Sequence, residues 1–307
     1  ADEITRLQRP YGGVVCLGEP GALRAGVRGD LPGGGQWTHN FADAGNTLDS
    51  GDTIVKGPLG MLWYQDETQE TIDRHGKSPA PLFYQGLILR EGTDTVRCLD
   101  AYNGTPRWEV ELPGVLAAYR EGTQVGGGQI GSTYCVADDV LYVRQDNRCL
   151  RFDVHSGEQM STFEAPPLDD GTVGRWGYLA SRDGILYGAL MNDEYVIKAQ
   201  HGDGGQRTQK PMDDHLTESA LLFAMDANTG HLEWTFTPQH SIRNNAIAVG
   251  SGRVYLIDRP VAQIDQYLKT EIKANRRGSG AFPPHPTGVL LALDARTGTV
   301  QWRDDNQ

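Results

Sequence analysis

Several features of other protein classes are missing from this sequence. No apolar run approaches the ~18 residues that a membrane-spanning helix needs, so we predict no membrane span. Basic residues are the minority, with 28 Lys and Arg against 40 Asp and Glu, and the formal net charge is −12. They form no cluster beyond the isolated pair Arg276-Arg277. An acidic chain without a basic patch argues against binding to nucleic acid or to an anionic membrane surface.

Sequence patterns for metals and disulfides are also missing. The four cysteines, Cys16, Cys98, Cys135 and Cys149, form no CxxC or CxxCH, so a zinc ribbon or a covalently attached haem has no support. The eight histidines show neither HxH nor HExxH spacing, and we predict no metal site. Cysteines on strands are usually buried free thiols. One disulfide could form if the protein is exported, but its pairing does not follow from the sequence.

Helix-favouring runs are scarce, whereas glycine is abundant at 39 of 307 residues. Short β-rich segments alternate with Gly, Asn and Asp, which is typical of an all-β protein. The chain is 38% hydrophobic and 22% charged, as expected for a globular protein with a full core.

A hairpin motif occurs four times. The motif is an apolar residue, Asp, a small residue, two turn residues, Gly, and a strand that ends in Trp. Its copies are residues 99–108, 225–234, 293–302 and 152–160. The copy at 152–160 lacks the Trp. A short carboxylate can accept hydrogen bonds from the amides of its own turn, and Gly supplies the positive φ that closes the turn. We predict that the copies form equivalent turns in successive units. The structural repeat residues are Asp100, Gly104, Trp108, Asp153, Gly157, Asp226, Gly230, Trp234, Asp294, Gly298 and Trp302.

Each motif belongs to a longer unit of four short β-rich segments joined by tight turns. Units of this kind predict the four-stranded antiparallel blades of a β-propeller. Insertions at 192–218 and 262–286 fall between the second and third strands of their units, so we expect them on one face. We expect a single propeller domain over 1–307. Its parts are the trailing part of a blade (1–40), an irregular blade (41–79) and four blades (80–113, 130–165, 174–238 and 244–304).

The Leu-Asp-Ala-x-Thr-Gly-x-x-x-Trp hairpin resembles the PQQ-like repeat of quinoprotein alcohol dehydrogenases and of BamB-type outer-membrane assembly lipoproteins. The similarity covers residues 80–302, and residues 37–43 also resemble PQQ-like repeat proteins of environmental bacteria. It implies an all-β propeller of about five to eight blades in the complete ring. A quinoprotein ring has eight blades, whereas four clear units are present here. Either the ring is small and closed by residues 1–79, or the missing strands lie in another segment, and we favour a chain that is part of a larger whole. The resemblance also implies that Trp108, Trp234 and Trp302 dock against the next blade, a role that suits a large amphipathic ring at a strand end.

Polar residues at the start of the innermost strands are candidates for a ligand site in the central channel. Arg175 with Trp176 is the best pair, because an Arg beside an indole can hold an anionic or planar ligand. The alternative is that these residues satisfy strand-end backbone groups and each other, with Trp176 in the core. The candidate ligand-binding residues are Arg175, Trp176, Arg243, Asn244, Asn245, Ser132, Thr133 and His39, together with His75 from the irregular part.

No catalytic residue is predicted. The resemblance implies that a PQQ site would need a vicinal disulfide and acidic residues around calcium, but no two cysteines are adjacent. The stretch Trp37 to Asp43 has the residue types of a hydrolytic site without a GxSxG nucleophile, which favours a structural His39. The acid pairs Asp169-Asp170 and Asp213-Asp214 are most simply solvated loop charges.

We expect an exported, periplasmic or secreted bacterial scaffold that binds a protein partner or another segment completing the propeller. A small ligand could also bind in its channel. Ala1-Asp2-Glu3 could be what cleavage of a signal peptide leaves behind. The alternative, from a different class, is a quinoprotein-like oxidoreductase that uses PQQ and calcium to oxidise alcohols or sugars, or the propeller part of such an enzyme.

Overall fold

The computed structural model describes residues 2–65, 79–92, 94–116, 132–192, 197–198, 211–212, 218–260 and 288–305. Within these ranges the fold is almost entirely antiparallel β-sheet, as the sequence predicts. The exceptions are an N-terminal helix, α1 (Asp2–Leu7), and a 3₁₀ turn, η4 (Asn244–Ala246). None of the helices in the described part of the chain could cross a membrane.

Four units of four strands, here called blades 1 to 4, form the body of the molecule. Blade 1 contains β3 (Leu82–Tyr84), β4 (Leu87–Glu91), β5 (Thr95–Asp100) and β6 (Pro106–Glu111). Blade 2 contains β7 (Tyr134–Ala137), β8 (Val140–Gln145), β9 (Arg148–Asp153) and β10 (Gln159–Glu164). Blade 3 contains β11 (Trp176–Arg182), β12 (Ile185–Met191), β15 (Glu218–Asp226) and β16 (Leu232–Phe236). Blade 4 contains β18 (Ala248–Gly250), β19 (Arg253–Asp258), β20 (Val289–Asp294) and β21 (Val300–Asp304).

Blades 3 and 4 are joined by a short strand, β17 (Ile242–Arg243), which pairs with the start of β15 and with the end of β19. The insertion at 192–218 contributes the pair β13 (Ile197–Lys198) and β14 (Pro211–Met212). The rest of that insertion, the insertion at 262–286 and His75 lie outside the described residues, as do the pairs Asp213-Asp214 and Arg276-Arg277.

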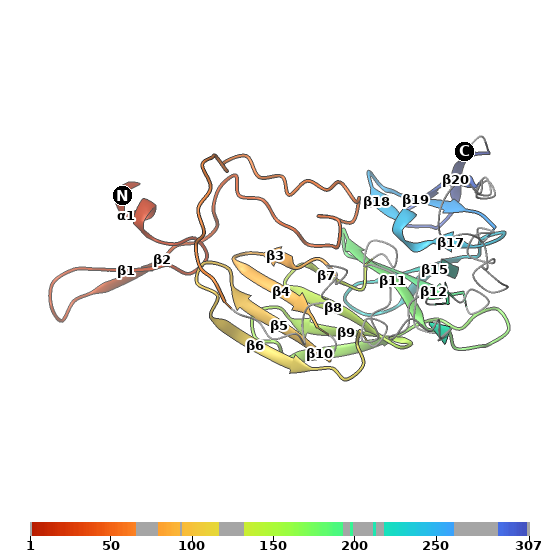
Figure 1. Ribbon diagram of the computed structural model, residues 1–307, viewed down its shortest axis with the longest axis horizontal. Coiled ribbons are helices and arrows are strands. Elements are labelled where there is room, and N and C mark those ends of the chain that lie inside the picture. The colour runs from red at the N-terminus through yellow and green to blue at the C-terminus, as the bar shows by residue number, and fades with distance from the viewer. Residues whose placement is uncertain are drawn as a thin grey trace, which may run out of the picture.

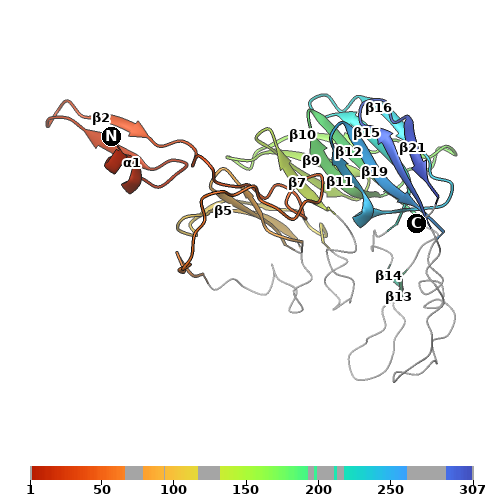
Figure 2. The same ribbon diagram turned by 90° about the horizontal axis from the view of Figure 1, so that it is seen from above.

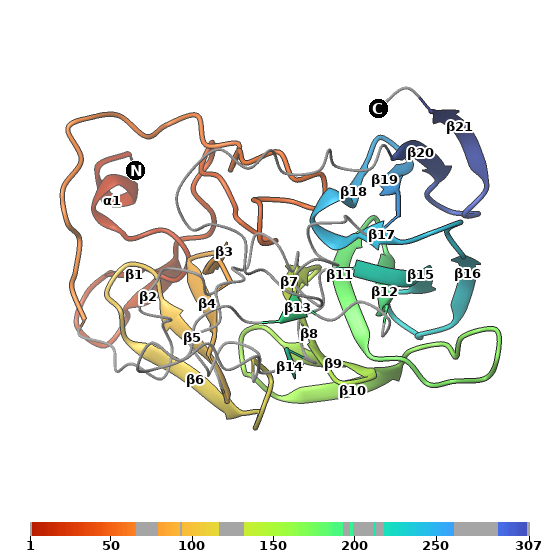
Figure 3. The ribbon, with the colours of Figure 1, turned by 45° about the vertical axis from the view of Figure 1, so that its right-hand side comes forward.

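The blades follow one another along an arc, with their first strands inside and their fourth strands outside (Figure 3). This is the arrangement of a β-propeller. The described residues do not close the arc into a ring. A two-stranded hairpin, β1 (Val14–Leu17) with β2 (Arg24–Val27), stands apart from the blades at one end of the molecule (Figures 1 and 2).

The hydrophobic core lies between neighbouring blades. Alternate side chains of β7 face opposite ways, so Tyr134 and Val136 pack toward blade 1 while Cys135 packs toward blade 3. On β8, Leu141 and Tyr142 divide in the same manner. The strands of blades 2 and 3 that are buried on both faces contain continuous apolar runs, because each of these blades has a neighbouring sheet on either side.

The four repeated turns are closed by the same backbone hydrogen bond. In every turn the Gly amide donates to the carbonyl oxygen of the Asp (2.8–2.9 Å), and the Gly has a φ between +68° and +74°. The Oδ1 atoms of Asp153, Asp226 and Asp294 accept from the amides two and three residues further on (2.7–3.0 Å). The Asp100 Oδ1 accepts only from the first of these, at Tyr102 (3.0 Å), because its carboxylate also pairs with Arg107 and Arg9. The Asp-x-x-x-Gly spacing thus places these residues at one point of every blade.

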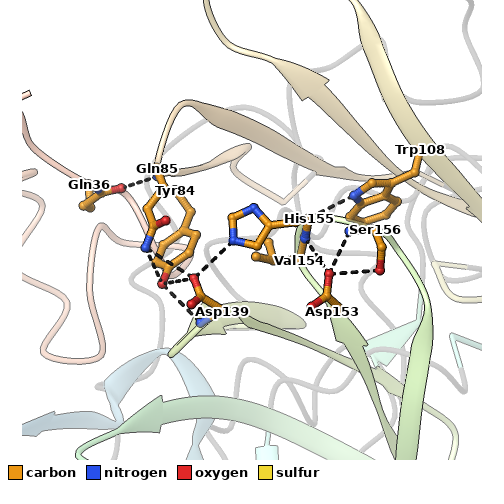
Figure 4. Close-up of polar contacts among 9 residues, drawn as sticks. All are labelled: Gln36, Tyr84, Gln85, Trp108, Asp139, Asp153, Val154, His155 and Ser156. Carbon is orange, nitrogen blue, oxygen red and sulfur yellow. Dashed lines mark hydrogen bonds and ion pairs between the residues drawn. The ribbon is translucent and has the colours of Figure 1, made fainter. Parts of the chain in front are cut away.

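An aromatic ring from the preceding segment covers each turn glycine. A methyl group at Gly157 would lie 2.7 Å from the Trp108 ring, and one at Gly298 would lie 2.6 Å from the Trp234 ring. The indole nitrogens donate to the carbonyl oxygen that follows the turn Asp, as Trp108 does to Val154 (2.9 Å; Figure 4). Only glycine fits under these rings, which explains why the turn position is always glycine.

Two of the docking rings are absent from the sequence motif. Phe163 covers Gly230 in place of the missing Trp, and Trp63 covers Gly104 and donates to the Ala101 carbonyl oxygen (2.8 Å). Trp63 lies in the part of residues 41–65 that contains no strand. It nevertheless takes the docking position of a fourth strand.

Candidate functional site

The candidate ligand residues lie on the face where first strands begin and second strands end. Ser132 and Thr133 precede β7, Arg175 precedes β11, and Asn245 lies in η4 before β18. The insertions of blades 3 and 4 leave from the same face, between β12 and β15 and between β19 and β20. Two clusters form there, and each surrounds a buried glutamate that belongs to no sequence motif.

The first cluster connects blades 1 and 2 around Glu91, at the end of β4. The Thr133 hydroxyl donates a hydrogen bond to Glu91 Oε2, and both side chains are buried. Burial raises the pKa of Glu91 to about 7, while Thr133 and the nearby Arg144 oppose the shift. Within the part of the chain that the structure describes, Glu91 Oε1 has no hydrogen-bond partner. Ser132 turns away from this carboxyl group and donates to the Tyr134 carbonyl oxygen (3.0 Å).

The second cluster connects blades 3 and 4 around Glu218, at the start of β15. Its Oε1 accepts from the guanidinium groups of Arg243 and Arg259 (3.2 Å each), and its Oε2 accepts from Ser241 (3.1 Å). Burial raises the pKa of Glu218, and the two arginines oppose the shift. Among the candidates, Asn244 joins the cluster's border, where its Oδ1 accepts from the Ser219 hydroxyl (2.6 Å).

Trp176 lies in the core between blades 2 and 3. It is fully buried, its ring meets Phe223 edge-to-face at 4.9 Å, and its Nε1 donates to the Tyr178 carbonyl oxygen (2.8 Å). Arg175 is half-buried, and its carbonyl oxygen accepts from the Met191 amide (2.8 Å). The indole therefore presents no exposed face to a ligand held by Arg175.

Residues 36–46, the inner segment, run along the first strands of all four blades. Trp37 exchanges two backbone hydrogen bonds with Phe83 of blade 1 (2.8 and 2.9 Å), and the Thr38 carbonyl oxygen accepts from Val136 of blade 2 (3.0 Å). The Ala44 carbonyl oxygen accepts from Val249 of blade 4 (2.7 Å). Figure 3 shows this part of the chain inside the arc. The inner segment thus covers the inner edge of the blades along their first strands.

His39 attaches the inner segment to blade 3. Its Nε2 accepts from the Ser181 amide (3.2 Å), so the ring proton lies on Nδ1, which is 2.8 Å from Thr38 Oγ1. Burial lowers the pKa of His39 to about 4, and Asp43 opposes the shift. With both nitrogens engaged and the ring neutral near pH 7, His39 acts as a structural link.

A polar network that no sequence motif predicts joins the β3–β4 turn of blade 1 to the β7–β8 and β9–β10 turns of blade 2 (Figure 4). Asp139 Oδ1 accepts from the Tyr84 hydroxyl (3.0 Å) and from Gln85 Nε2 (3.3 Å), and lies 3.3 Å from His155 Nε2. Partial burial raises the pKa of Tyr84. Because Asp139 and His155 are exposed and Asp139 already has three partners, the network suits a junction between blades better than proton transfer.

Among the described residues, the two buried glutamates of these clusters do not fit a calcium site. Calcium takes six to eight oxygen ligands, whereas Glu218 is neutralised by two guanidinium groups and Glu91 carries a raised pKa. Within the described ranges, no three His, Cys, Asp or Glu side chains are placed to hold a metal. Cys98, Cys135 and Cys149 are buried free thiols and Cys16 is an exposed one.

Known proteins share this arrangement of blades. The sequence matches the family described as Outer membrane protein assembly factor BamB over residues 33–187 and 215–307, most of the chain. A search of curated proteins found no match. Among solved structures, quinohemoprotein alcohol dehydrogenase ADHIIG from Pseudomonas putida HK5 has a TM-score of 0.51 at 14% identity, over 89% of this chain and 40% of its own.

The quinohemoprotein alcohol dehydrogenase from Comamonas testosteroni has a TM-score of 0.54 at 12% identity, over 89% of this chain and 41% of its own. BamB from Moraxella catarrhalis has a TM-score of 0.27 at 15% identity, over 72% of this chain and 62% of its own. At such identities the two dehydrogenases show the fold alone, and this chain spans about 40% of their length.

Proposed function

Because this chain belongs to the PQQ-like repeat family described as Outer membrane protein assembly factor BamB, we propose that it is an extracytoplasmic scaffold that holds a protein partner on its N-terminal segment, residues 2–65. The name of the family points to assembly in the outer membrane, and a periplasmic or secreted location follows from the same proposal.

The observation that supports this proposal is the distribution of exposed apolar side chains. Most of the large hydrophobic residues exposed in the described structure lie in residues 2–65, although that segment is the smaller part of it. They include Val27 on the protruding hairpin and Leu62 beside the docked Trp63. Large exposed apolar areas usually mark a contact with another molecule.

The hairpin β1–β2 gives a second reason. All but one of its residues are exposed, and the two strands pair only with each other. A single two-stranded hairpin is marginally stable in water, so a surface that covers its apolar side chains would stabilise it. A protein partner supplies such a surface.

The oxidoreductase alternative rests on the shared fold of the two dehydrogenases, and a fold does not specify an activity. It has its own test. Bound PQQ would absorb in the visible range, and dye-linked oxidation of alcohols or sugars after incubation with PQQ and calcium would favour the enzyme over the scaffold.

The scaffold is tested by site-specific photocrosslinking in the producing cells, with a benzophenone amino acid at Leu62, at Val27 or at Met160. Met160 is exposed on β10 of blade 2 and serves as the control. We expect the same partner adduct from Leu62 and Val27 and none from Met160. Adducts of equal yield at all three positions, or none at Leu62 and Val27, would contradict the proposal.

A further inference from the structure

The turn Asp of blade 1 differs from the turn Asp of the other three blades. The Asp100 side chain is 1% exposed and forms ion pairs with Arg9 Nη1 (2.7 Å) and with Arg107. The other three turn aspartates are partly exposed, and among the described residues they form no ion pair with an arginine. Arg9 lies outside the repeated units, shortly after α1. Blade 1 therefore uses its repeated turn to bind the N-terminal segment.

Arg9 contacts this turn in two ways. Besides the ion pair, its guanidinium group lies over the Tyr102 ring, 5.9 Å from the ring centroid. Burial raises the pKa of Asp100, but the hydrogen bonds from Arg107 and from the Tyr102 amide and the charge of Arg9 outweigh it, so the pKa is lowered. Asp100 is thus ionised near neutral pH. Water screens this ion pair less than an exposed one, because the carboxylate is buried.

Tyr11 makes a second contact with blade 1. A methyl group at Gly86, in the β3–β4 turn, would lie 2.7 Å from Tyr11 Cβ, so the Tyr11 side chain rests directly on this turn. The Tyr11 hydroxyl accepts a hydrogen bond from Gln36 Nε2 (3.3 Å), in the inner segment. One contact would leave the N-terminal segment free to rotate about it. Two separate contacts, at Asp100 and at Gly86, restrict that rotation.

Arg9 and Tyr11 lie at the base of the hairpin β1–β2, which stands apart from the blades (Figures 1 and 2). The Tyr11 amide donates to the Gly29 carbonyl oxygen (2.8 Å), and the Arg28 amide donates to the Gly13 carbonyl oxygen (2.8 Å). These bonds continue the ladder of β1 and β2 down to Tyr11. The direction of the hairpin therefore follows from where Arg9 and Tyr11 are held.

One face of this hairpin is apolar and carries no charge. Val14 pairs with Val27, and Cys16 pairs with Ala25. Because alternate residues of a strand point to the same side of a sheet, these four side chains share one face. All four are exposed, Val14 at 60% and Val27 at 69%. The surface that fits this face is itself apolar.

On the basis of the proposed scaffold function, we propose that Arg9 and Tyr11 are positioning residues that hold the hairpin in one direction relative to blade 1. The uncharged face of Val14 and Val27 is then fixed before an apolar surface of the protein partner covers it. A surface that is already fixed loses less conformational entropy on association, so the partner binds it more tightly than it would bind a freely moving hairpin.

The first test measures the direction of the hairpin in the purified full chain. Of the four cysteines, Cys16 is exposed and the other three are buried, so a nitroxide label reacts at Cys16. A second label is placed at Met160→Cys, which is exposed on β10 of blade 2. Electron paramagnetic resonance gives the distribution of distances between the two labels. We expect Arg9→Ala and Tyr11→Ala each to widen this distribution.

Arg6→Ala is the matched control and leaves the distribution unchanged, because Arg6 pairs with Glu3 of its own helix (2.6 Å). A double-mutant cycle with Asp100→Asn then tests whether Arg9 acts through Asp100, since Asn keeps the acceptor oxygen of the turn and removes the charge. We expect Arg9→Ala to add little to the widening that Asp100→Asn causes. No widening by Arg9→Ala, or the same added widening in both backgrounds, would overturn the proposal.

The second test connects the hairpin's direction to partner binding, through the photocrosslinking described above. We expect Arg9→Ala to lower the yield of the adduct at Val27 about fivefold or more relative to the adduct at Leu62, and Arg6→Ala to change neither. An unchanged yield at Val27 with a widened distance distribution would overturn the proposal and leave the scaffold standing. No adduct at either position in the unaltered chain would overturn the scaffold and, with it, this role of Arg9.

Discussion

Blades 1 to 4 and the N-terminal segment are stabilised by different kinds of contact. Neighbouring blades bury apolar side chains between their sheets and repeat one turn and one ring contact. The N-terminal segment has one short helix and one hairpin, exposes most of its large apolar side chains and attaches to the blades through the inner segment and Trp63. Repetition therefore accounts for folding, whereas the non-repeating segment carries the surface suited to a partner.

Removing an aromatic residue from each region gives the largest expected difference. Trp234→Ala deletes a buried ring and leaves a cavity beside Gly298, so we expect a loss of about 3–5 kcal/mol in the free energy of unfolding. Tyr64→Ala removes a ring that already lies in water and should change it by less than about 0.5 kcal/mol. Urea unfolding monitored by circular dichroism measures both. Similar losses would show that the segment is packed as tightly as a blade.

Two carboxyl groups, one in each region, should respond to pH in opposite directions. The pKa of Glu91 in blade 1 is raised to about 7, so its contribution to stability is fully present below pH 4.5 and is lost as the pH rises through 7, by about 3 kcal/mol. The pKa of Asp52 in the N-terminal segment is lowered by the amides of Val55 and Ile54, so its contribution is present above 3.8 and is lost on acidification.

Glu91→Gln, which keeps the shape but cannot ionise, should remove the loss of stability between about pH 5 and pH 9. The measurement is urea unfolding of both proteins at the two pH values. Asp52→Asn is the control and should leave that interval unchanged. A Glu91→Gln protein that still loses the same stability would place the titrating group elsewhere.

Two turn glycines allow the cost of the ring contact to be measured apart from the cost of the left-handed backbone conformation. Gly157 and Gly184 have φ values of +74° and +75°, but only Gly157 lies under a ring, that of Trp108. Gly184→Ala should cost about 1 kcal/mol for the left-handed conformation alone, and Gly157→Ala should cost about 2 kcal/mol more because its methyl group meets the indole. Thermal unfolding measures the loss of stability in each variant. Equal losses would mean that the Trp108 ring moves aside without a cost in stability.

Much of the fold follows from local sequence, and most of the candidate site does not. The Asp-x-x-x-Gly spacing predicts the turns because every hydrogen bond in them lies within a few residues. The bond from Ser181 to His39 spans 142 residues, and no periodic pattern predicts such a contact. Glu91 lies at the end of an apolar strand, a position where a glutamate is usually exposed to solvent. Only the neighbouring blade, which brings Thr133, makes it a buried acid.

The smallest expected difference between the two regions is at Trp63. This residue belongs to the N-terminal segment but packs on a turn glycine in the same way as the Trp residues of the blades. Phe163 shows that a phenyl ring alone can cover a turn glycine. Trp63→Phe should therefore keep the packing on Gly104 and lose only the hydrogen bond to Ala101, at a cost of about 1 kcal/mol. Trp108→Phe removes the corresponding bond to Val154 and should cost the same, as chemical denaturation would show. A cost at Trp63 well below that at Trp108 would mean that the segment rests loosely on blade 1, because a hydrogen bond contributes little where water can replace its partner.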